Sequence, residues 1–282
     1  MIKVTKFGGS SVANAKQFAK VKHIIDSDPS RKFIVTSACG KESHEDHKVT
    51  DLLYLIQAHI KYGVSYESLF DMIVKKYKSI QEELHLHVDL DEEFLKIRKI
   101  IQNDDSPDYL VSRGEYLTGK LLAEYLGAKF VDAADVIMFH YDGTIDMKRT
   151  SEKLMQHVQG SEKILIPGFY GATPNGTIKV MSRGGSDITG AVLANVVDAD
   201  VFSTAMCLCH RNNSIVFSAS NSCNCMWWIY FIHFTANFHN HCSRMIRFIR
   251  ITNINRNILL SHRENRIIMQ NICSHVTHFS QF

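Results

Sequence analysis

The sequence lacks an apolar run long enough to cross a membrane. Its most apolar stretch, Met226–Phe234, includes His233 and spans only nine residues, whereas a membrane helix needs about 20. The N-terminus lacks the basic and then apolar pattern of a signal peptide. Residues 1–200 hold one of the seven cysteines, Cys39, which is typical of a reducing compartment. We therefore expect a cytoplasmic protein with no membrane partner.

Residues 201–282 contain no Gly, Pro, Asp or Lys, although the whole chain has 15 Gly and 4 Pro. About six Gly and four Pro are expected in a segment of this length, and a folded domain uses them to turn its chain. The same segment holds six Cys, seven His, seven Arg and a single acid, Glu264. This abrupt change of composition indicates that residues 1–200 carry the function.

The formal net charge of +3 does not indicate a nucleic-acid partner. Residues 1–200 carry 25 Lys and Arg against 28 Asp and Glu, so the excess of basic residues lies in the remaining segment. A basic surface would attract nucleic acid through its field, whereas the part of the chain with ordinary composition is mildly acidic. We expect a small-molecule substrate and no nucleic-acid partner.

Residues 1–200 alternate between continuous apolar segments, typical of buried parallel strands, and segments with helical spacing. Strands are expected at 2–6, 33–37, 128–132, 135–138 and 163–167. Helices are expected at 12–25, 50–62, 66–83, 91–102 and 106–126, after a cap at Ser151, and at 183–197. This alternation predicts an α/β protein, a three-layer α/β/α sandwich around a mostly parallel sheet.

The first strand ends at Lys6 and leads into Gly8, Gly9 and Ser10. Glycines let backbone N–H groups approach an anion closely, and a helix N-terminus favours negative charge. Together with the Lys6 charge, the loop predicts binding of nucleotide phosphates. The alternative is a plain strand–helix turn with a solvated lysine.

A second loop, Arg183-Gly-Gly-Ser186-Asp187, repeats this arrangement at the start of another helix. An arginine can clamp a carboxylate through two parallel hydrogen bonds. Asp187 alone would be read as an ordinary acid at a helix start. Two such loops in one α/β domain favour a phosphate site over the two alternatives, a plain strand–helix turn at Lys6 and an ordinary helix-start acid at Asp187.

The segment Arg113-Gly114-Glu115 interrupts a predicted helix with glycine. Glycine costs about 1 kcal/mol there relative to alanine, which indicates that another part of the chain packs closely. The alternative is an exposed Arg–Glu face. The surrounding residues also match the spacing of a Walker A loop, but Leu121 stands where a Ser or Thr must bind magnesium, so we reject that motif.

Six segments, taken in chain order, resemble the signatures of the aspartokinases within the amino acid kinase family. They are Lys6-Phe-Gly-Gly-Ser-Ser-Val12, Val35-Thr-Ser-Ala38, Thr50-Asp-Leu-Leu53, Ser112-Arg-Gly-Glu115, Gly168-Phe-Tyr-Gly171 and Ser182-Arg-Gly-Gly-Ser-Asp187. The resemblance covers about residues 1–201. One departure is Ser182, where many members carry Gly, and we expect this small residue to be tolerated.

The resemblance implies the amino acid kinase fold and transfer of the ATP γ-phosphoryl group, with Mg²⁺, to the β-carboxylate of L-aspartate. The product, 4-phospho-L-aspartate, enters lysine, threonine and methionine biosynthesis. By position, the resemblance assigns catalysis to Lys6 and Asp187, nucleotide binding to Lys6, Gly8, Gly9, Ser10 and Ser186, and aspartate binding to Ser37, Thr50, Glu115 and Arg183. In this assignment Glu115 holds the ammonium group and Arg183 a carboxylate, while no protein residue is assigned to a metal. A kinase of the glutamate or carbamate type is the alternative within the fold.

The resemblance ends near Val201, where aspartokinases continue into a Thr-Asp-x-x-Gly loop, adenine contacts and two regulatory ACT domains. We interpret residues 202–282 as an out-of-frame translation, disordered or poorly folded, with an aggregation-prone segment at 226–232. The catalytic part, residues 1–201, would then lack its last strands, and we expect impaired or absent activity. We therefore expect the regulatory domains, through which the family usually forms homo-oligomers, to be absent.

Two other interpretations of the chain stay open. Residues 202–282 would be a metal-binding module if their cysteine pairs bound zinc, but Cys207/Cys209 and Cys223/Cys225 are separated by one residue rather than by two to four. Alternatively, the product is not an enzyme and is a binding remnant or a pseudogene product.

Overall fold

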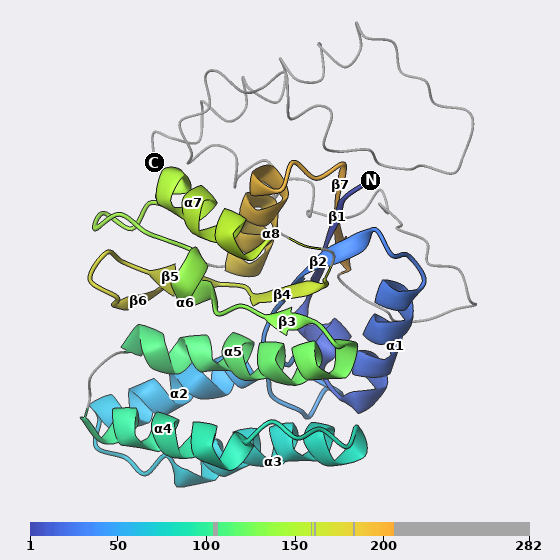
Figure 1. Ribbon diagram of the computed structural model, residues 1–282. Coiled ribbons are helices and arrows are strands. Elements are labelled where there is room, and N and C mark those ends of the chain that lie inside the picture. The colour runs from blue at the N-terminus through green and yellow to red at the C-terminus, as the bar shows by residue number, and fades with distance from the viewer. Residues whose placement is uncertain (104–106, 159, 161, 183, 206–282) are drawn as a thin grey trace, which may run out of the picture. The chain divides into compact units, whose positions relative to one another are not determined.

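The computed structural model describes residues 1–205, except 104–106, 159, 161 and 183 (Figure 1). The expectations for residues 206–282, among them the aggregation-prone segment and the cysteine pairs, lie outside the described residues. Arg183 of the second glycine loop also lies outside them. No described helix is both long and apolar enough to cross a membrane.

A five-stranded parallel sheet forms the centre of the described residues, with the order β3-β4-β2-β1-β7. Its strands are β1 (Lys3–Phe7), β2 (Arg31–Thr36), β3 (Lys129–Phe130), β4 (Ile164–Pro167) and β7 (Val201–Ala205). The expected parallel sheet is therefore confirmed. Because all five strands run the same way, the segments that follow β1, β2 and β4 meet at one edge.

Helices cover both faces of this sheet, which confirms the predicted three layers (Figure 1). On one face α8 (Gly185–Val196) packs against β1 and β2, with α7 (Met147–His157) beside it. On the other face α5 (Pro107–Leu126) packs against β3 and β4, and α1 (Ala15–Asp26) lies next to it. Beyond α5 the chain adds α2 (Val49–Lys61), α3 (Glu67–Glu83) and α4 (Leu90–Asn103).

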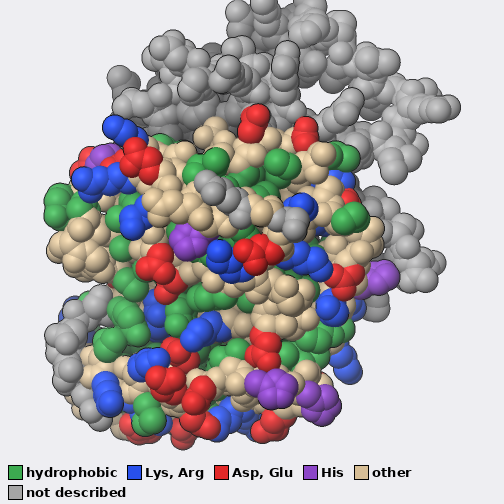
Figure 2. Space-filling model, viewed as in Figure 1, with side chains coloured by type: hydrophobic (Ala, Val, Ile, Leu, Met, Phe, Trp, Pro, Cys, Tyr) green, Lys and Arg blue, Asp and Glu red, His purple; other side chains and the backbone are tan. Residues whose placement is uncertain are grey.

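The spacing of apolar residues explains these positions. The outer helix α3 buries Phe70, Ile73, Tyr77 and Ile80, which follow one another at intervals of three or four residues on one helix face. Burial of each such side chain stabilises the fold by about 2 kcal/mol. The central strands are buried on both faces, as expected for a parallel sheet covered by helices. Figure 2 shows acidic and basic side chains interspersed over the face it views.

Two predicted helix starts were wrong because nearby side chains provide better caps. After the first glycine loop the chain forms a short 3₁₀ helix, Gly9–Val12, and α1 begins only after Asn14. The Asn14 side chain accepts a hydrogen bond from Gln17 N at 3.0 Å, which satisfies a free N–H group of the first turn. Likewise, α7 is capped by Asp146, whose side chain accepts from Arg149 N, rather than by Ser151.

The predicted strand at 135–138 was also wrong. The chain instead forms a single helical turn, α6 (Ala133–Val136), after Asp132, whose side chain accepts a hydrogen bond from Ala134 N. The glycine-rich segment after β4, for which no strand was predicted, contains an antiparallel hairpin of β5 (Tyr170–Ala172) and β6 (Ile178–Val180).

Candidate active site

An ion pair between Lys6 and Asp187 lies where β1 ends. The Lys6 ammonium is 2.9 Å from one carboxylate oxygen of Asp187 and 3.1 Å from the other. Asp187 stands in the first turn of α8 and also accepts a hydrogen bond from the Thr204 hydroxyl at 3.3 Å. The Lys6 side chain is only 7% exposed, so its charge acts in a poorly screened environment. The structure therefore joins the two residues that the sequence assigned to catalysis.

The loop after Lys6 packs directly against the segment that follows β2. Gly40 N donates to Gly9 O at 2.9 Å. A Cβ atom on Gly40 would lie 2.6 Å from the carbonyl carbon of Gly9, and one on Gly9 would lie 2.9 Å from Ala38 O. Glycine is thus required for the contact between two backbones, a role that the sequence did not reveal. Ser10, next in this loop, is exposed at the same end of the sheet.

The second glycine loop brings α8 against the end of β4. Gly184 precedes α8 in the left-handed conformation, with φ of 88°, which favours glycine. A Cβ atom on Gly168 would lie 2.6 Å from Ser186 Cα, so the chain after β4 touches the start of α8. Ser186 is buried at this contact. Both glycine loops therefore lie at the edge where the parallel strands end.

The glycine inside α5 allows a close approach, as predicted. A Cβ atom on Gly114 would lie 2.9 Å from Ala38 Cβ and 3.2 Å from Leu53 Cδ1. The alternative of an exposed Arg–Glu face is wrong, because Arg113 and Glu115 are both buried. The helix thus carries a carboxylate into the interior beside the segment that follows β2.

Glu115 is a buried acid with an incomplete set of partners. Its side chain belongs to a residue only 4% exposed, and among the described residues its Oε2 atom has no hydrogen-bond partner. Burial raises the pKa of this carboxyl to about 8, although the N–H groups of Ala38 and Glu115 and the charges of Lys6 and Arg113 oppose the rise. A cationic group placed at Oε2 would restore the ionised form.

Ser37 and Thr50, the two other residues assigned to aspartate binding that the structure describes, begin segments around this acid. Ser37 N donates to Phe7 O at 3.0 Å, which holds the end of β2 against the end of β1. Thr50 lies in the first turn of α2, where Val49 N donates to Cys39 O at 3.1 Å. Both residues are partly exposed, so their side chains are available to a ligand.

Arg113 lies among aromatic rings, which was not predicted from the sequence. Its guanidinium group lies 4.2 Å from the ring centroids of both Tyr109 and Tyr116 and 5.5 Å from that of Tyr170. Such contacts stabilise a buried cation. The signal was present in the sequence, because Tyr109 and Tyr116 flank Arg113 at helical intervals of four and three residues.

The described residues offer no cluster of three or more His, Cys, Asp or Glu side chains able to hold a metal ion. They do offer glycine loops beside a lysine. This combination fits Mg²⁺ that arrives with a nucleotide, because Mg²⁺ keeps several waters and binds largely through substrate phosphates.

Comparison with known proteins places this site in a family. A sequence model of the amino acid kinase family matches residues 1–204. The chain belongs to the amino acid kinase family.

The relatives that it matches in sequence include aspartokinases. Over 218 residues the chain is 36% identical to aspartokinase 3 of Bacillus subtilis, and the matched region covers 71% of the chain and 47% of that protein. The crystal structure of Clostridium acetobutylicum aspartate kinase superimposes with a TM-score of 0.69 at 49% identity, over 72% of the chain and 47% of the other. Escherichia coli aspartokinase III, solved in complex with aspartate and ADP, gives 0.63 at 25% identity, over 72% and 49%.

These findings confirm the resemblance to aspartokinases over about the first 200 residues. They also set its extent, since the chain spans about half the length of these three relatives.

Proposed function

We propose that residues 1–201 form the catalytic region of an aspartate kinase, which transfers the γ-phosphoryl group of ATP to the β-carboxylate of L-aspartate. The observation that carries the proposal is the buried Glu115 carboxylate, one oxygen of which has no hydrogen-bond partner among the described residues, on the same edge as the Lys6–Asp187 pair. A buried acid of this kind suits the ammonium group of an amino acid. The relatives add support, because one of them was solved with aspartate and ADP bound.

Lys6 would steady the phosphoryl group during transfer. Such a reaction needs alignment and neutralisation of negative charge more than covalent help from the protein. The Lys6 ammonium is well placed for this, because it is nearly inaccessible to water and is held by Asp187 at 2.9 Å. Asp187 would orient the lysine rather than touch the nucleotide.

The two glycine loops would bind the nucleotide. Gly8, Gly9 and Ser10 would present backbone N–H groups to the phosphates, and Ser186 would approach them from the start of α8. Mg²⁺ bound by the same phosphates would supply further neutralisation of charge. No protein residue is assigned to the ion.

Aspartate would lie between α5 and the segments that follow β1 and β2. Glu115 would accept hydrogen bonds from its ammonium group, and Ser37 and Thr50 would contact its carboxylates, together with Arg183. The β-carboxylate that attacks the phosphoryl group is already ionised at neutral pH. The site therefore has no need of a strong general base.

Beyond β7, residues 206–282 would contribute little to this chemistry. Their lack of Gly, Pro, Asp and Lys supports an origin outside the kinase fold, by translation out of frame. We expect impaired or absent activity, in a protein of the cytoplasm.

The direct test is aspartate-dependent release of ADP, measured for the 282-residue chain and for Lys6→Ala. Loss of an electrostatic stabiliser of this kind lowers turnover by about 10²–10³-fold. Lys20→Ala, which removes an exposed lysine of α1, is the matched control and should behave as the unmodified chain. Turnover that Lys6→Ala leaves unchanged would contradict the assignment.

Substrate choice is tested with glutamate and carbamate in place of aspartate. Faster turnover with either would assign the chain to another kinase of the same fold. Nucleotide binding without turnover on any of the three would identify a binding remnant.

A further inference from the structure

The loop of residues 40–48, here called the 40–48 loop, joins two parts of the candidate site. It begins beside the first glycine loop, where Gly40 N donates to Gly9 O at 2.9 Å. It ends at the start of α2, directly before Val49 and Thr50. Its two ends are closed by the hydrogen bond from Val49 N to Cys39 O at 3.1 Å. The last residue of the loop, Lys48, accepts a hydrogen bond from Leu52 N in α2 at 3.1 Å, so a change in the second half of the loop would move the start of α2, where Thr50 stands.

Asp46 organises this loop from within. Of residues 41–48 it is the one that is not classed as exposed. Its carboxylate accepts hydrogen bonds from Glu42 N at 2.8 Å and from His47 N at 2.7 Å. Burial alone would raise the pKa of Asp46, but these bonds and the Lys76 ammonium hold it below its ordinary value. Asp46 is thus the ionised centre of a loop whose other side chains face water.

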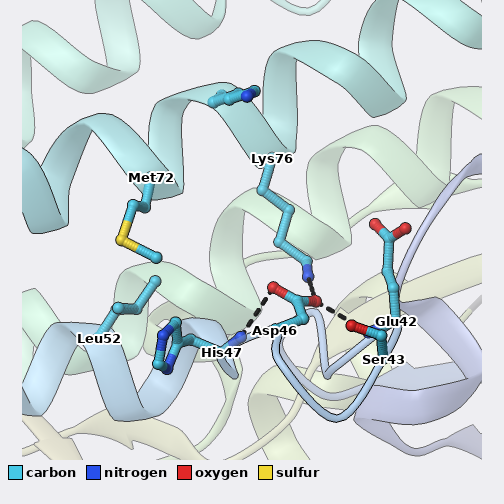
Figure 3. Close-up of a pocket in the computed structure, with 8 residues that line it drawn as sticks. Glu42, Ser43, Asp46, His47, Leu52, Met72 and Lys76 are labelled. Atoms are coloured by element: carbon cyan, nitrogen blue, oxygen red, sulfur yellow. Dashed lines mark hydrogen bonds and ion pairs between the residues drawn. The ribbon is translucent and has the colours of Figure 1, made fainter.

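Lys76 of α3 completes the set of donors to Asp46. The Lys76 ammonium lies 2.5 Å from the Asp46 carboxylate, and the Lys76 side chain is 9% exposed. Figure 3 shows Lys76 reaching from its helix to the loop and meeting Asp46 there. The next residue, Tyr77, turns to the other side and donates to Gly114 O at 2.7 Å. The same turn of α3 therefore supports both the loop and the helix that carries Glu115.

An open pocket of about 380 Å³ lies between the loop and α3, lined by loop residues and by Leu52, Met72 and Lys75. Lys75 is exposed and makes no ion pair within the described part of the chain. Because a space of this size leaves room for the loop to move, the position of the loop depends on the Asp46–Lys76 pair rather than on packing.

We propose that Lys76, through Asp46, is a positioning residue that fixes the 40–48 loop and so holds Thr50 in place for the amino acid substrate. This inference rests on the proposed function, because it assigns the effect to the aspartate side of the site. The nucleotide side is held separately, by the contact of Gly40 with Gly9. Loss of the ion pair should therefore weaken binding of aspartate and leave binding of ATP nearly unchanged.

The first experiment measures the loop itself and needs no activity. Trypsin cuts after Lys41 and Lys48, and mass spectrometry follows the two products in the 282-residue chain. Lys76→Met should speed both cuts by about tenfold, the usual effect of losing a charge-assisted hydrogen bond. Lys76→Arg should restore the slow rate, and Lys75→Met, the matched control on the same helix, should not change it. Equal rates for Lys76→Met and Lys75→Met would overturn the role of the ion pair.

The second experiment separates the two substrates. In Lys76→Met the KM for aspartate should rise about three- to tenfold while the KM for ATP stays within about twofold. Asp46→Asn should have the same effect. The double variant should not raise the KM for aspartate beyond that of the more strongly affected single variant, because both changes remove the same interaction. Thermal unfolding confirms that each variant is folded, and Asp46→Asn decides the result if Lys76→Met does not fold.

The outcomes distinguish the inference from the function on which it rests. If the unmodified chain neither binds nor phosphorylates aspartate, the proposed function and the effect on Thr50 fall together, while the trypsin result still decides the role of the ion pair. If both KM values rise equally, the pair supports the fold as a whole and the positioning role is refuted.

Discussion

Replacement of Glu115 by glutamine should stabilise the protein at neutral and alkaline pH. In the fold, burial raises the pKa of the Glu115 carboxyl from its ordinary 4.5 to about 8. In the unfolded chain the carboxyl is ionised above pH 4.5, whereas in the folded chain it keeps its proton until about pH 8. Folding therefore takes up a proton between these values, and the free energy of unfolding falls as the pH rises through this window.

The size of the effect follows from the two pKa values. Each pH unit between them costs about 1.4 kcal/mol, so the loss reaches about 5 kcal/mol at pH 8 and stays level above it. Glutamine has nearly the same shape and never ionises. The difference in stability between Glu115→Gln and the unmodified chain should be close to zero near pH 4.5 and should grow steadily to pH 8.

Urea denaturation at pH 5, 6, 7, 8 and 9 measures this difference directly. Glu42→Gln, which changes an exposed glutamate, is the control and should show no such slope. Stability curves of Glu115→Gln and the unmodified chain that run parallel across this range would refute the reasoning. The same data test the site, because an amino acid whose ammonium group reaches Oε2 should raise the midpoint of the unmodified chain at pH 8 and not that of Glu115→Gln.

Four further substitutions test the packing around the site by urea denaturation. Gly114→Ala should lower the free energy of unfolding by about 1–2 kcal/mol, because overpacking at the 2.9 Å contact exceeds the gain in helix propensity; an increase in stability would contradict the close approach. Tyr77→Phe removes a buried hydroxyl that donates to Gly114 O at 2.7 Å and lies 3.0 Å from the Thr118 hydroxyl, and should cost about 1–2 kcal/mol, whereas an unchanged midpoint would show that these bonds add nothing. Glu93→Gln leaves the Lys120 ammonium, 2.7 Å from the buried carboxylate, without its counter-charge and should cost about 1–3 kcal/mol. Lys120→Met should cost less than Glu93→Gln, because the Glu93 carboxylate keeps a second ammonium, that of Lys96 at 3.4 Å; the reverse order would refute this account.

The alternation of apolar strands and amphipathic helices was sufficient to predict the layers and the direction of the strands. It failed where a single side chain decides a local structure. Asp132 and Asp146 cap helices through hydrogen bonds to N–H groups two and three residues ahead, and apolar periodicity carries no information about such bonds. The hairpin at 170–180 was missed for a related reason, since its strands have only three residues each and show no clear alternation.

The candidate site was predicted in part. The sequence named Lys6, Asp187 and Glu115, and the structure joins the first two in an ion pair and buries the third. Nothing in the sequence indicated that Gly40 contacts Gly9. The contact joins two loops 31 residues apart and depends on strand order, which local sequence patterns do not encode. The Asp46–Lys76 pair was missed for the same reason.

The segment Ala38–Gly40 lies between the first glycine loop and α5, and on both sides it makes contacts that a Cβ atom in place of glycine would block. Gly9 and Gly40 meet backbone to backbone, and Gly114 meets Ala38. In a scan of all amino acids, these three glycines should therefore reject every replacement alike, whether it is polar, charged or apolar. The neighbouring Ser37 and Thr50, whose side chains are partly exposed, should discriminate among replacements by their chemistry. Positions that reject every replacement should thus mark the backbone contacts around the site. Positions that are selective for the chemistry of the side chain should mark the residues that contact the ligand.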